Sequence, residues 1–176
     1  EEDDFVLVIG SSGIDIKGRP HDNFELGVPN QGHIRNSIGG VARNIAENLA
    51  RLEIPIVLLT AVGDDAEGER VIDACEALDI DCDSVLIVEK ARTGTYMALL
   101  KPDGELEVAI SDFEIMSHIT PAYLHENEDL FEDATMIVMD ATLPMETIAT
   151  VFELADQYDV PICADPTTPD LAPKLC

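Results

Sequence analysis

The stretch "SIGGVARNIAENLARLEIPIVLLT", residues 37–60, contains an extended segment, two adjacent glycines, a helical pattern and a strand-like run. Apolar residues recur through its middle at helical spacing, at Val41, Ile45, Leu49 and Leu52. This spacing predicts a helix with one apolar face and with Arg43, Glu47 and Arg51 turned away from it. Residues 56–60 are continuously apolar, which is typical of a parallel strand covered on both faces.

The two glycines, Gly39 and Gly40, stand directly before this predicted helix. Glycine inside a helix costs about 1 kcal/mol relative to alanine, so something at this point requires bare backbone. Two explanations remain open: a turn needed only for packing, and a helix N-terminus where a ligand approaches backbone N–H groups. The spacing matches neither GxGxxG nor GxxxxGK[ST], so a Rossmann or P-loop phosphate site is not predicted.

The rest of the chain alternates strand-like and helical patterns. Apolar runs predict further strands at 5–10, 135–140 and 161–165. Helical patterns at about 66–78 and 145–158 lie between strands. We expect the first helix to bury Val71, Ile72, Cys75 and Leu78. We expect the second helix to bury Ile148, Val151, Phe152 and Ala155. Such alternation predicts an α/β fold with a mainly parallel sheet flanked by helices.

One region departs from this alternation. Residues 93–112, "TGTYMALLKPDGELEVAISD", predict a hairpin that turns at Pro102-Asp103-Gly104. With "FELGV" (24–28) and "GHIRNSI" (32–38), the hairpin is expected to form a small protruding sheet. We therefore predict one domain over residues 1–176, with the protruding segments at about 24–38 and 93–112.

Composition limits the function. The 176 residues carry a formal net charge of −26, which disfavours nucleic acid or an anionic membrane as a partner. The apolar runs are far shorter than the ~20 residues of a membrane span, and no signal peptide is recognised at the start, so a cytoplasmic protein is expected. The four cysteines lack metal-site spacing and are expected to be free thiols, and no metal ligands are predicted.

Several polar residues are candidates for ligand binding. Asp15 follows the first strand, at the edge of an α/β sheet where ligands bind, although a solvated loop acid is the simpler interpretation. Asn44 lies one turn into the first helix, where its amide could bind a sugar hydroxyl or hold the glycine turn. Asp64 or Asp65, after Gly63, is interpreted as a helix N-cap. Asp140 and Asp165 end strands, which is weak evidence for a ligand or metal contact.

In order and spacing, "VIGSSGID", "GGVARNIA", "AVGDDAEG", the hairpin and "ADPTTP" resemble the PfkB-type carbohydrate kinases, the ribokinase-like family. Within that family, "GGVARNIAENLARL" and "VAISD" look most like the motifs of pseudouridine kinases. The resemblance implies a ribokinase-like fold whose small sheet is a lid over the sugar and often a dimer surface. It further implies that the intact protein uses ATP and Mg²⁺ to phosphorylate the 5′-hydroxyl of pseudouridine.

The resemblance also implies roles for individual residues. Asp15 would hold ribose hydroxyls, Gly39 and Gly40 would bring backbone against the sugar, and Asn44 would fix another hydroxyl. Two lid residues, Tyr96 and Asp112, would face the substrate.

Two departures from the family pattern accompany the resemblance. Glu53 stands where relatives have a helix-ending glycine, and we expect a reshaped turn there. The catalytic Asp of the family's GAGD loop, its metal motif and most of its ATP site are expected beyond Cys176. The chain alone is therefore expected to be inactive, and no catalytic residue is assigned within it. The alternatives are a kinase of another sugar or nucleoside and a non-catalytic module for sugar binding or dimerisation.

Overall fold

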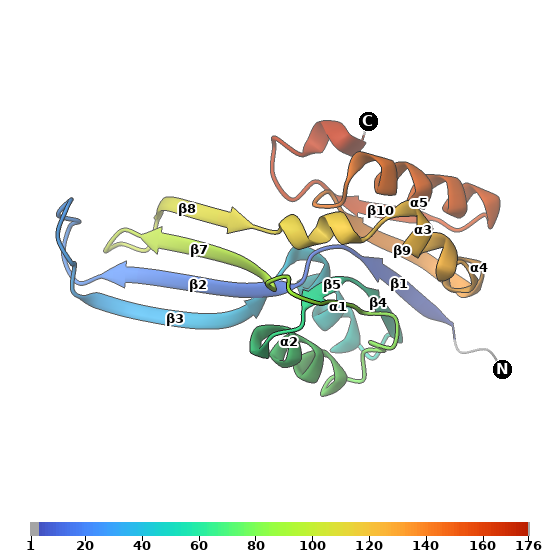
Figure 1. The fold of residues 1–176 in the computed structure, drawn as a ribbon, viewed down its shortest axis with the longest axis horizontal. Helices are drawn as coiled ribbons and strands as arrows, with labels where there is room; N and C mark the ends of the chain where they lie inside the picture. Colours follow the sequence, from blue (N-terminus) through green and yellow to red (C-terminus); the bar gives the residue numbers. More distant parts are fainter. Residues whose placement is uncertain (1–3, 176) are drawn as a thin grey trace.

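The structure is a computed structural model that describes residues 4–175. A four-stranded parallel sheet with the order β10-β9-β1-β4 forms the centre of its body. These strands are the predicted apolar runs, and their bounds are β1 Phe5–Ile9, β4 Ile56–Leu59, β9 Ala134–Asp140 and β10 Ile162–Asp165. Because the four strands are parallel, their carboxyl ends lie along one edge, from which a second sheet projects (Figure 1).

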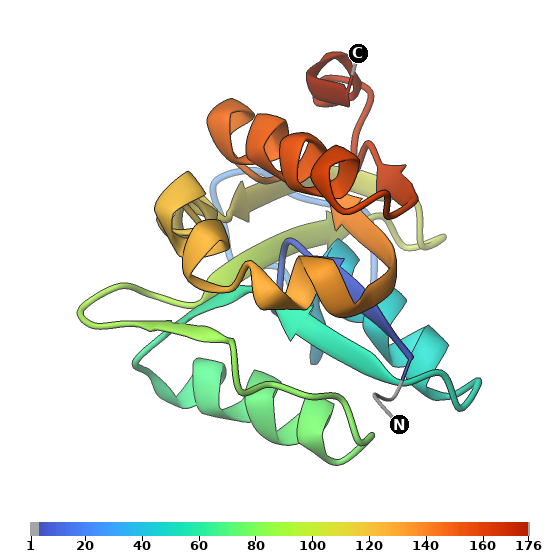
Figure 2. The same cartoon turned by 90° about the vertical axis from the view of Figure 1, so that its right-hand side faces the viewer.

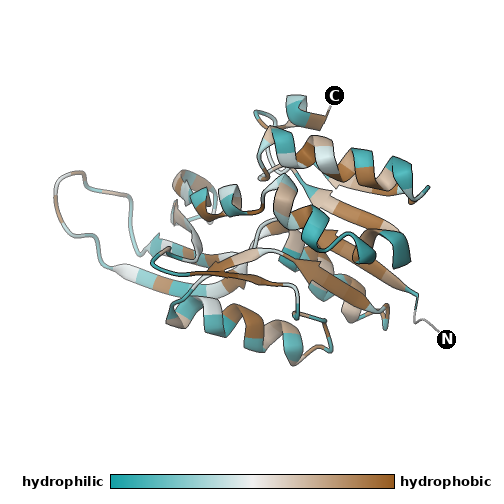
Figure 3. Ribbon diagram, turned by 45° about the vertical axis from the view of Figure 1, so that its right-hand side comes forward, coloured by the Kyte–Doolittle hydropathy of each residue, from teal (hydrophilic) through white to brown (hydrophobic). Residues whose placement is uncertain are grey.

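Helices cover the two faces of the body sheet (Figure 2). They are α1 Val41–Ala50, α2 Ala66–Glu76, α3 Pro121–Glu126, α4 Asp129–Asp133 and α5 Met145–Gln157. Alternate strand residues point to opposite sides: Leu7 and Ile9 pack in the core with α5, whereas Val8 and Leu58 pack with α1. This burial on both faces explains why the strand sequences are continuously apolar. In Figure 3 these strands are mostly brown, whereas the helices beside them carry both hydrophobic (brown) and hydrophilic (teal) residues. The predicted α/β architecture is confirmed.

Short elements complete the body. β5 Ala61–Gly63 pairs in parallel with β6 Leu86–Val88 beside the main sheet. Single 3₁₀ turns occupy Glu114–His118 and Ala172–Leu175. Within residues 4–175, no helix has both the length and the apolar content of a membrane span. Cys75, Cys82 and Cys163 are free thiols, as expected, and Cys176 lies outside the described residues.

The projecting sheet, which we call the lid sheet, has the order β3-β2-β7-β8. Its strands are β2 Gly13–Pro20, β3 Gly32–Gly39, β7 Gly94–Leu100 and β8 Leu106–Asp112. The hairpin of β7 and β8 is confirmed, but the prediction of a strand at 24–28 is wrong, because these residues belong to the connection between β2 and β3. The predicted segments also omitted β2, whose glycine, proline and charged residues disguise a strand that is held between two neighbours.

Four details of the helix predictions need correction. Arg43 is buried instead of turned outward. Leu52 is 70% exposed because α1 ends at Ala50, and Phe152 is 40% exposed because Val151 and Leu154 occupy the inner face of α5. The turn after α1 keeps the form that glycine favours: Glu53 itself adopts φ +62°, and the Ile54 N–H donates to the Leu49 carbonyl at 3.2 Å.

Candidate functional site

The glycine pair lies where the lid sheet meets the N-terminus of α1, and its surroundings explain it. Gly40 has φ +94°, and a Cβ atom there would lie 2.4 Å from the carbonyl oxygen of Ser11. A Cβ atom on Gly39 would lie 2.3 Å from Oδ1 of Asp15. Both distances are too short for any side chain. At Gly40 the neighbour is backbone and φ is positive, so bare backbone is required there, whereas a side chain at Gly39 would displace the Asp15 carboxylate.

Asp15 lies within β2, so the alternative interpretation as a solvated loop acid is wrong. It pairs with Ser37 on one side and with Tyr96 on the other. Its side chain is 21% exposed, and its Oδ2 atom lies 3.5 Å from Nζ of Lys17. A carboxylate that is only partly covered, directly above the glycine turn, keeps the capacity to accept hydrogen bonds from a ligand.

Asp140, at the end of β9, organises the backbone beneath this carboxylate. It is fully buried, and its Oδ2 atom accepts hydrogen bonds from Ser11 N (2.8 Å), Ser11 Oγ (2.7 Å) and Ala42 N (3.0 Å). Its Oδ1 atom accepts from the N–H (2.9 Å) and the hydroxyl of Thr142. Ser11 Oγ in turn accepts from Val41 N at 2.9 Å. Asp140 therefore joins the β1–β2 connection to the start of α1, an arrangement that its place at a strand end did not reveal.

The first turns of α1 contain a buried arginine. The Arg43 N–H donates to the Ser11 carbonyl at 3.1 Å, and its guanidinium forms an ion pair with Glu47. Arg43 Nη1 also lies 3.4 Å from Oδ1 of Asn44, whose side chain is exposed. Hydrogen bonding from Arg51, together with the charge of Arg43, holds the pKa of Glu47 below its ordinary value. Arg43 thus orients Asn44, a role that the helical pattern could not predict.

A second carboxylate fixes the base of the lid sheet. Asp65 caps α2 by accepting from Gly68 N at 2.8 Å, which confirms the N-cap interpretation. The same side chain accepts from Thr93 N (2.9 Å) and Thr93 Oγ1 (2.6 Å), directly before β7. Although burial acts to raise the pKa of Asp65, these hydrogen bonds hold it below its ordinary value. The lid sheet is therefore attached to the body at α1 and at α2.

Strand register decides which of the predicted site residues come together. Side chains at paired positions share a face, and this places Asp15, Ser37, Tyr96 and Ser111 on one face of the lid sheet. We call this the inner face. Asp112 pairs with Thr95 and so lies on the opposite, outer face. The structure thus groups Asp15, Gly39, Gly40 and Tyr96, places Asn44 one helical turn away, and does not bring Asp112 to them. Ser111 was missed because it becomes a candidate only once the register is known.

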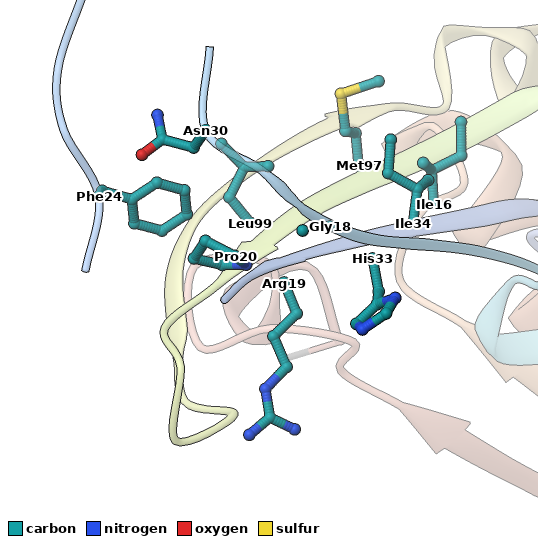
Figure 4. Close-up of a pocket in the computed structure, with 11 residues that line it drawn as sticks. Ile16, Gly18, Arg19, Pro20, Phe24, Asn30, His33, Ile34, Met97 and Leu99 are labelled. Carbon is teal, nitrogen blue, oxygen red and sulfur yellow. The ribbon is translucent and has the colours of Figure 1, made fainter. Parts of the chain in front are cut away.

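Beyond its base, where Ile14 and Ile16 pack against α2, the outer face of the lid sheet is apolar and largely exposed. Its large side chains, several of them among the most exposed apolar residues described, are Ile16, Ile34, Met97, Leu99, Val108 and Ile110. Phe24, from the connection after β2, closes a groove of about 340 Å³ over part of this face. Figure 4 shows Phe24, Leu99 and Met97 on this side of the sheet and Arg19 and His33 pointing away from it.

Among residues 4–175, no three His, Cys, Asp or Glu side chains converge as metal ligands would. Asp140 satisfies its oxygens with protein donors, and Asp165 accepts from Thr167 N at 2.6 Å. The partly exposed carboxylate of Asp15 can accept hydrogen bonds from a ligand.

Known proteins are similar in sequence to almost the whole of this chain. Residues 3–176 match the model of the pfkB family of carbohydrate kinases. The chain is 36% identical over 167 residues to the pseudouridine kinase of Escherichia coli strain K12, a match that covers 95% of this chain and 53% of that protein. It is 30% identical over 174 residues to an uncharacterised sugar kinase of the same strain, covering 99% of this chain and 48% of that protein.

A solved structure extends the likeness to the fold. A carbohydrate kinase from Agrobacterium tumefaciens superimposes with a TM-score of 0.86 at 27% identity, covering 98% of this chain and 56% of that one. The chain thus spans about half the length of the relatives that it matches.

Proposed function

Because this chain belongs to the PfkB family of carbohydrate kinases, we propose that it forms the acceptor-binding part of an ATP-dependent sugar or nucleoside kinase. The acceptor that we propose is pseudouridine, phosphorylated on its 5′-hydroxyl, and the likeness to the E. coli pseudouridine kinase supports this choice. The observation that carries the proposal is the partly exposed carboxylate of Asp15 above the bare backbone of Gly39 and Gly40.

Each residue of the site has a proposed role. Asp15 accepts hydrogen bonds from two ribose hydroxyls, and the glycine backbone lets the sugar approach the positive end of α1. Asn44, oriented by Arg43, binds a further hydroxyl. Tyr96 and Ser111 lie along the inner face of the lid sheet, beside the base. Closure of the lid sheet over the sugar excludes water from the acceptor hydroxyl.

ATP and Mg²⁺ are the cofactors that the family implies. When bound, ATP supplies the phosphoryl group and the metal neutralises charge during the transfer. The described residues do not fit either group, because they show no convergent set of cation ligands and no glycine-rich phosphate loop. We therefore assign no residue of this chain to the nucleotide or the metal and derive no step through them.

Replacing Asp15 by asparagine is expected to weaken nucleoside binding by roughly 100-fold. Hydrogen bonds to a charged group contribute about 1.5–3 kcal/mol each, and tenfold corresponds to about 1.4 kcal/mol. Calorimetric titration of the protein and its variant with pseudouridine, uridine and ribose measures the loss. Asp22→Asn, an exposed acid in the connection after β2, is the control and should bind as the original does. Equal affinities of Asp15→Asn and the original would contradict the assigned role.

A specific observation supports a second acceptor class. Lys17 and Arg35 pair on the inner face next to Asp15, although the chain has only ten Lys and Arg residues. Two cations there favour a phosphorylated sugar. Ribose 1-phosphate therefore belongs in the titration, and the intact protein should be assayed for phosphorylation of all four compounds. A preference for ribose 1-phosphate would replace pseudouridine as the acceptor, and turnover of none would favour the non-catalytic binding module.

We further propose that a second copy of the chain covers the outer face of the lid sheet. Ile34 is 76% exposed and Ile110 is 68% exposed, and both lie on this continuous apolar face. Exposed patches of this kind mark association surfaces. Ile110→Lys is expected to convert a dimer to monomers in sedimentation equilibrium, whereas Ile87→Lys, on β6, should leave the dimer intact. A monomeric original protein would contradict this proposal.

A further inference from the structure

Two of the four histidines come together at the far end of the lid sheet. The antiparallel pairing of β2 and β3 joins Arg19 to His33, and it continues beyond the strands, since the His21 N–H donates to the Gln31 carbonyl at 3.0 Å. His21 and His33 are therefore diagonal neighbours on the inner face of the lid sheet. At such positions long side chains from adjacent strands can touch. The backbone itself thus places the two imidazoles next to each other.

The side chains converge as the register requires. The two Nε2 atoms lie 3.3 Å apart, with ring centroids at 4.8 Å and ring planes at 64°. A straight N–H···N hydrogen bond of this length would separate the centroids by about 5.5 Å. The shorter separation means that the rings are inclined to the line between the two Nε2 atoms. Two nitrogens bound at ~2.05 Å to a tetrahedral Zn²⁺ lie about 3.3 Å apart.

The surroundings leave this point accessible. His21 and His33 are both exposed, so water can reach a bound ion. Arg19, the cross-strand partner of His33, donates from Nε and Nη2 to the carbonyl of Pro102 in the hairpin turn. The net charge of −26 attracts cations to the molecule as a whole.

We propose that His21 and His33 form a two-histidine binding site for a divalent transition-metal ion such as Zn²⁺ or Ni²⁺, with water in the remaining positions. Imidazole nitrogen suits these ions, whereas Mg²⁺ prefers oxygen. The histidine that donates the present hydrogen bond carries its proton on Nδ1 once both Nε2 atoms are bound. The ion joins the two ends of the 21–31 connection, which carries Phe24 over the outer groove. This site is independent of the proposed kinase activity.

Titration of the purified protein with Zn²⁺ and Ni²⁺ tests the proposal, followed by calorimetry and by NMR of the imidazole resonances. We expect one ion per chain, with selective shifts of the His21 and His33 signals that EDTA reverses. His21→Ala and His33→Ala should each abolish these shifts, and His118→Ala, at an exposed histidine of a 3₁₀ turn, should retain them. Circular dichroism establishes that each variant is folded.

Three results would overturn the proposal. Zn²⁺ and Ni²⁺ could leave both histidine signals unchanged, because they bind only elsewhere or not at all. His21→Ala could retain the original affinity at the His33 signal. Mg²⁺ could produce the same shifts at the same concentration, which would indicate a diffuse response to charge. None of these results bears on nucleoside binding, which is measured without transition metals.

Discussion

Replacing Asp140 by alanine is expected to lower the free energy of unfolding by about 4 kcal/mol, because it leaves buried N–H donors without partners. The carboxylate accepts from Ser11 N and Ala42 N, and both donors lose this partner when the side chain is removed. Such a loss is a large part of the stability of a domain of this size. Urea unfolding of the original and variant proteins, followed by circular dichroism, measures the difference.

Two further variants define the cause. Asp140→Asn keeps the volume of the side chain but turns an amide N–H₂ toward protein donors, so it should lose almost as much stability as alanine. Asp156→Asn, on the exposed side of α5, should remain within about 0.5 kcal/mol of the original. A loss below about 1 kcal/mol for Asp140→Ala would show that the buried hydrogen bonds are replaced by others.

Gly40→Ala is expected to cost about 3 kcal/mol and to weaken nucleoside binding at the same time. The residue has φ +94°, which is strained for any side chain, and the new Cβ would lie 2.4 Å from the Ser11 carbonyl oxygen. Relief of this clash must move either the β1–β2 connection or the start of α1, and both belong to the site. Denaturant unfolding and calorimetric titration with pseudouridine measure the two effects.

Gly27 supplies a matched control for Gly40. It has φ +82°, but nothing lies within 4 Å of a Cβ atom placed there. Gly27→Ala therefore introduces backbone strain without a clash, and it should cost about 1 kcal/mol and leave nucleoside affinity unchanged. Equal losses for the two variants would mean that strain alone, and not the contact with Ser11, accounts for the glycine at position 40.

The body could be predicted from the sequence because its signals are local. Continuous apolar runs marked β1, β4, β9 and β10, and helical spacing marked α1, α2 and α5. The expectation of a reshaped turn after α1 was wrong, because it assumed that only glycine could adopt the conformation at this position. Glu53 adopts φ +62°, and two backbone hydrogen bonds hold the turn around it. Strand β2 was omitted for the opposite reason: its local propensity is poor, and pairing on both sides determines its conformation.

The candidate site could be predicted only in part. The motif residues Asp15, Gly39 and Gly40 do come together, and Tyr96 pairs with Asp15. Asp112 was expected to face the substrate as Tyr96 does, but hairpin register is invisible in the sequence, and a shift of one residue reverses the face. Ser111 and the orientation of Asn44 by Arg43 were missed for the same reason, because each depends on a neighbour supplied by the fold.

By itself, the sequence determined the α/β class, the hairpin and the need for bare backbone before α1, because hydrophobic period, turn chemistry and glycine act over a few residues. Only the tertiary structure decided why the backbone must be bare. Asp15 and Ser11 press on Gly39 and Gly40 from a different strand and connection, and Asp140 holds that connection from 129 residues away. Contacts over such separations arise from packing of the whole domain, which no local pattern records.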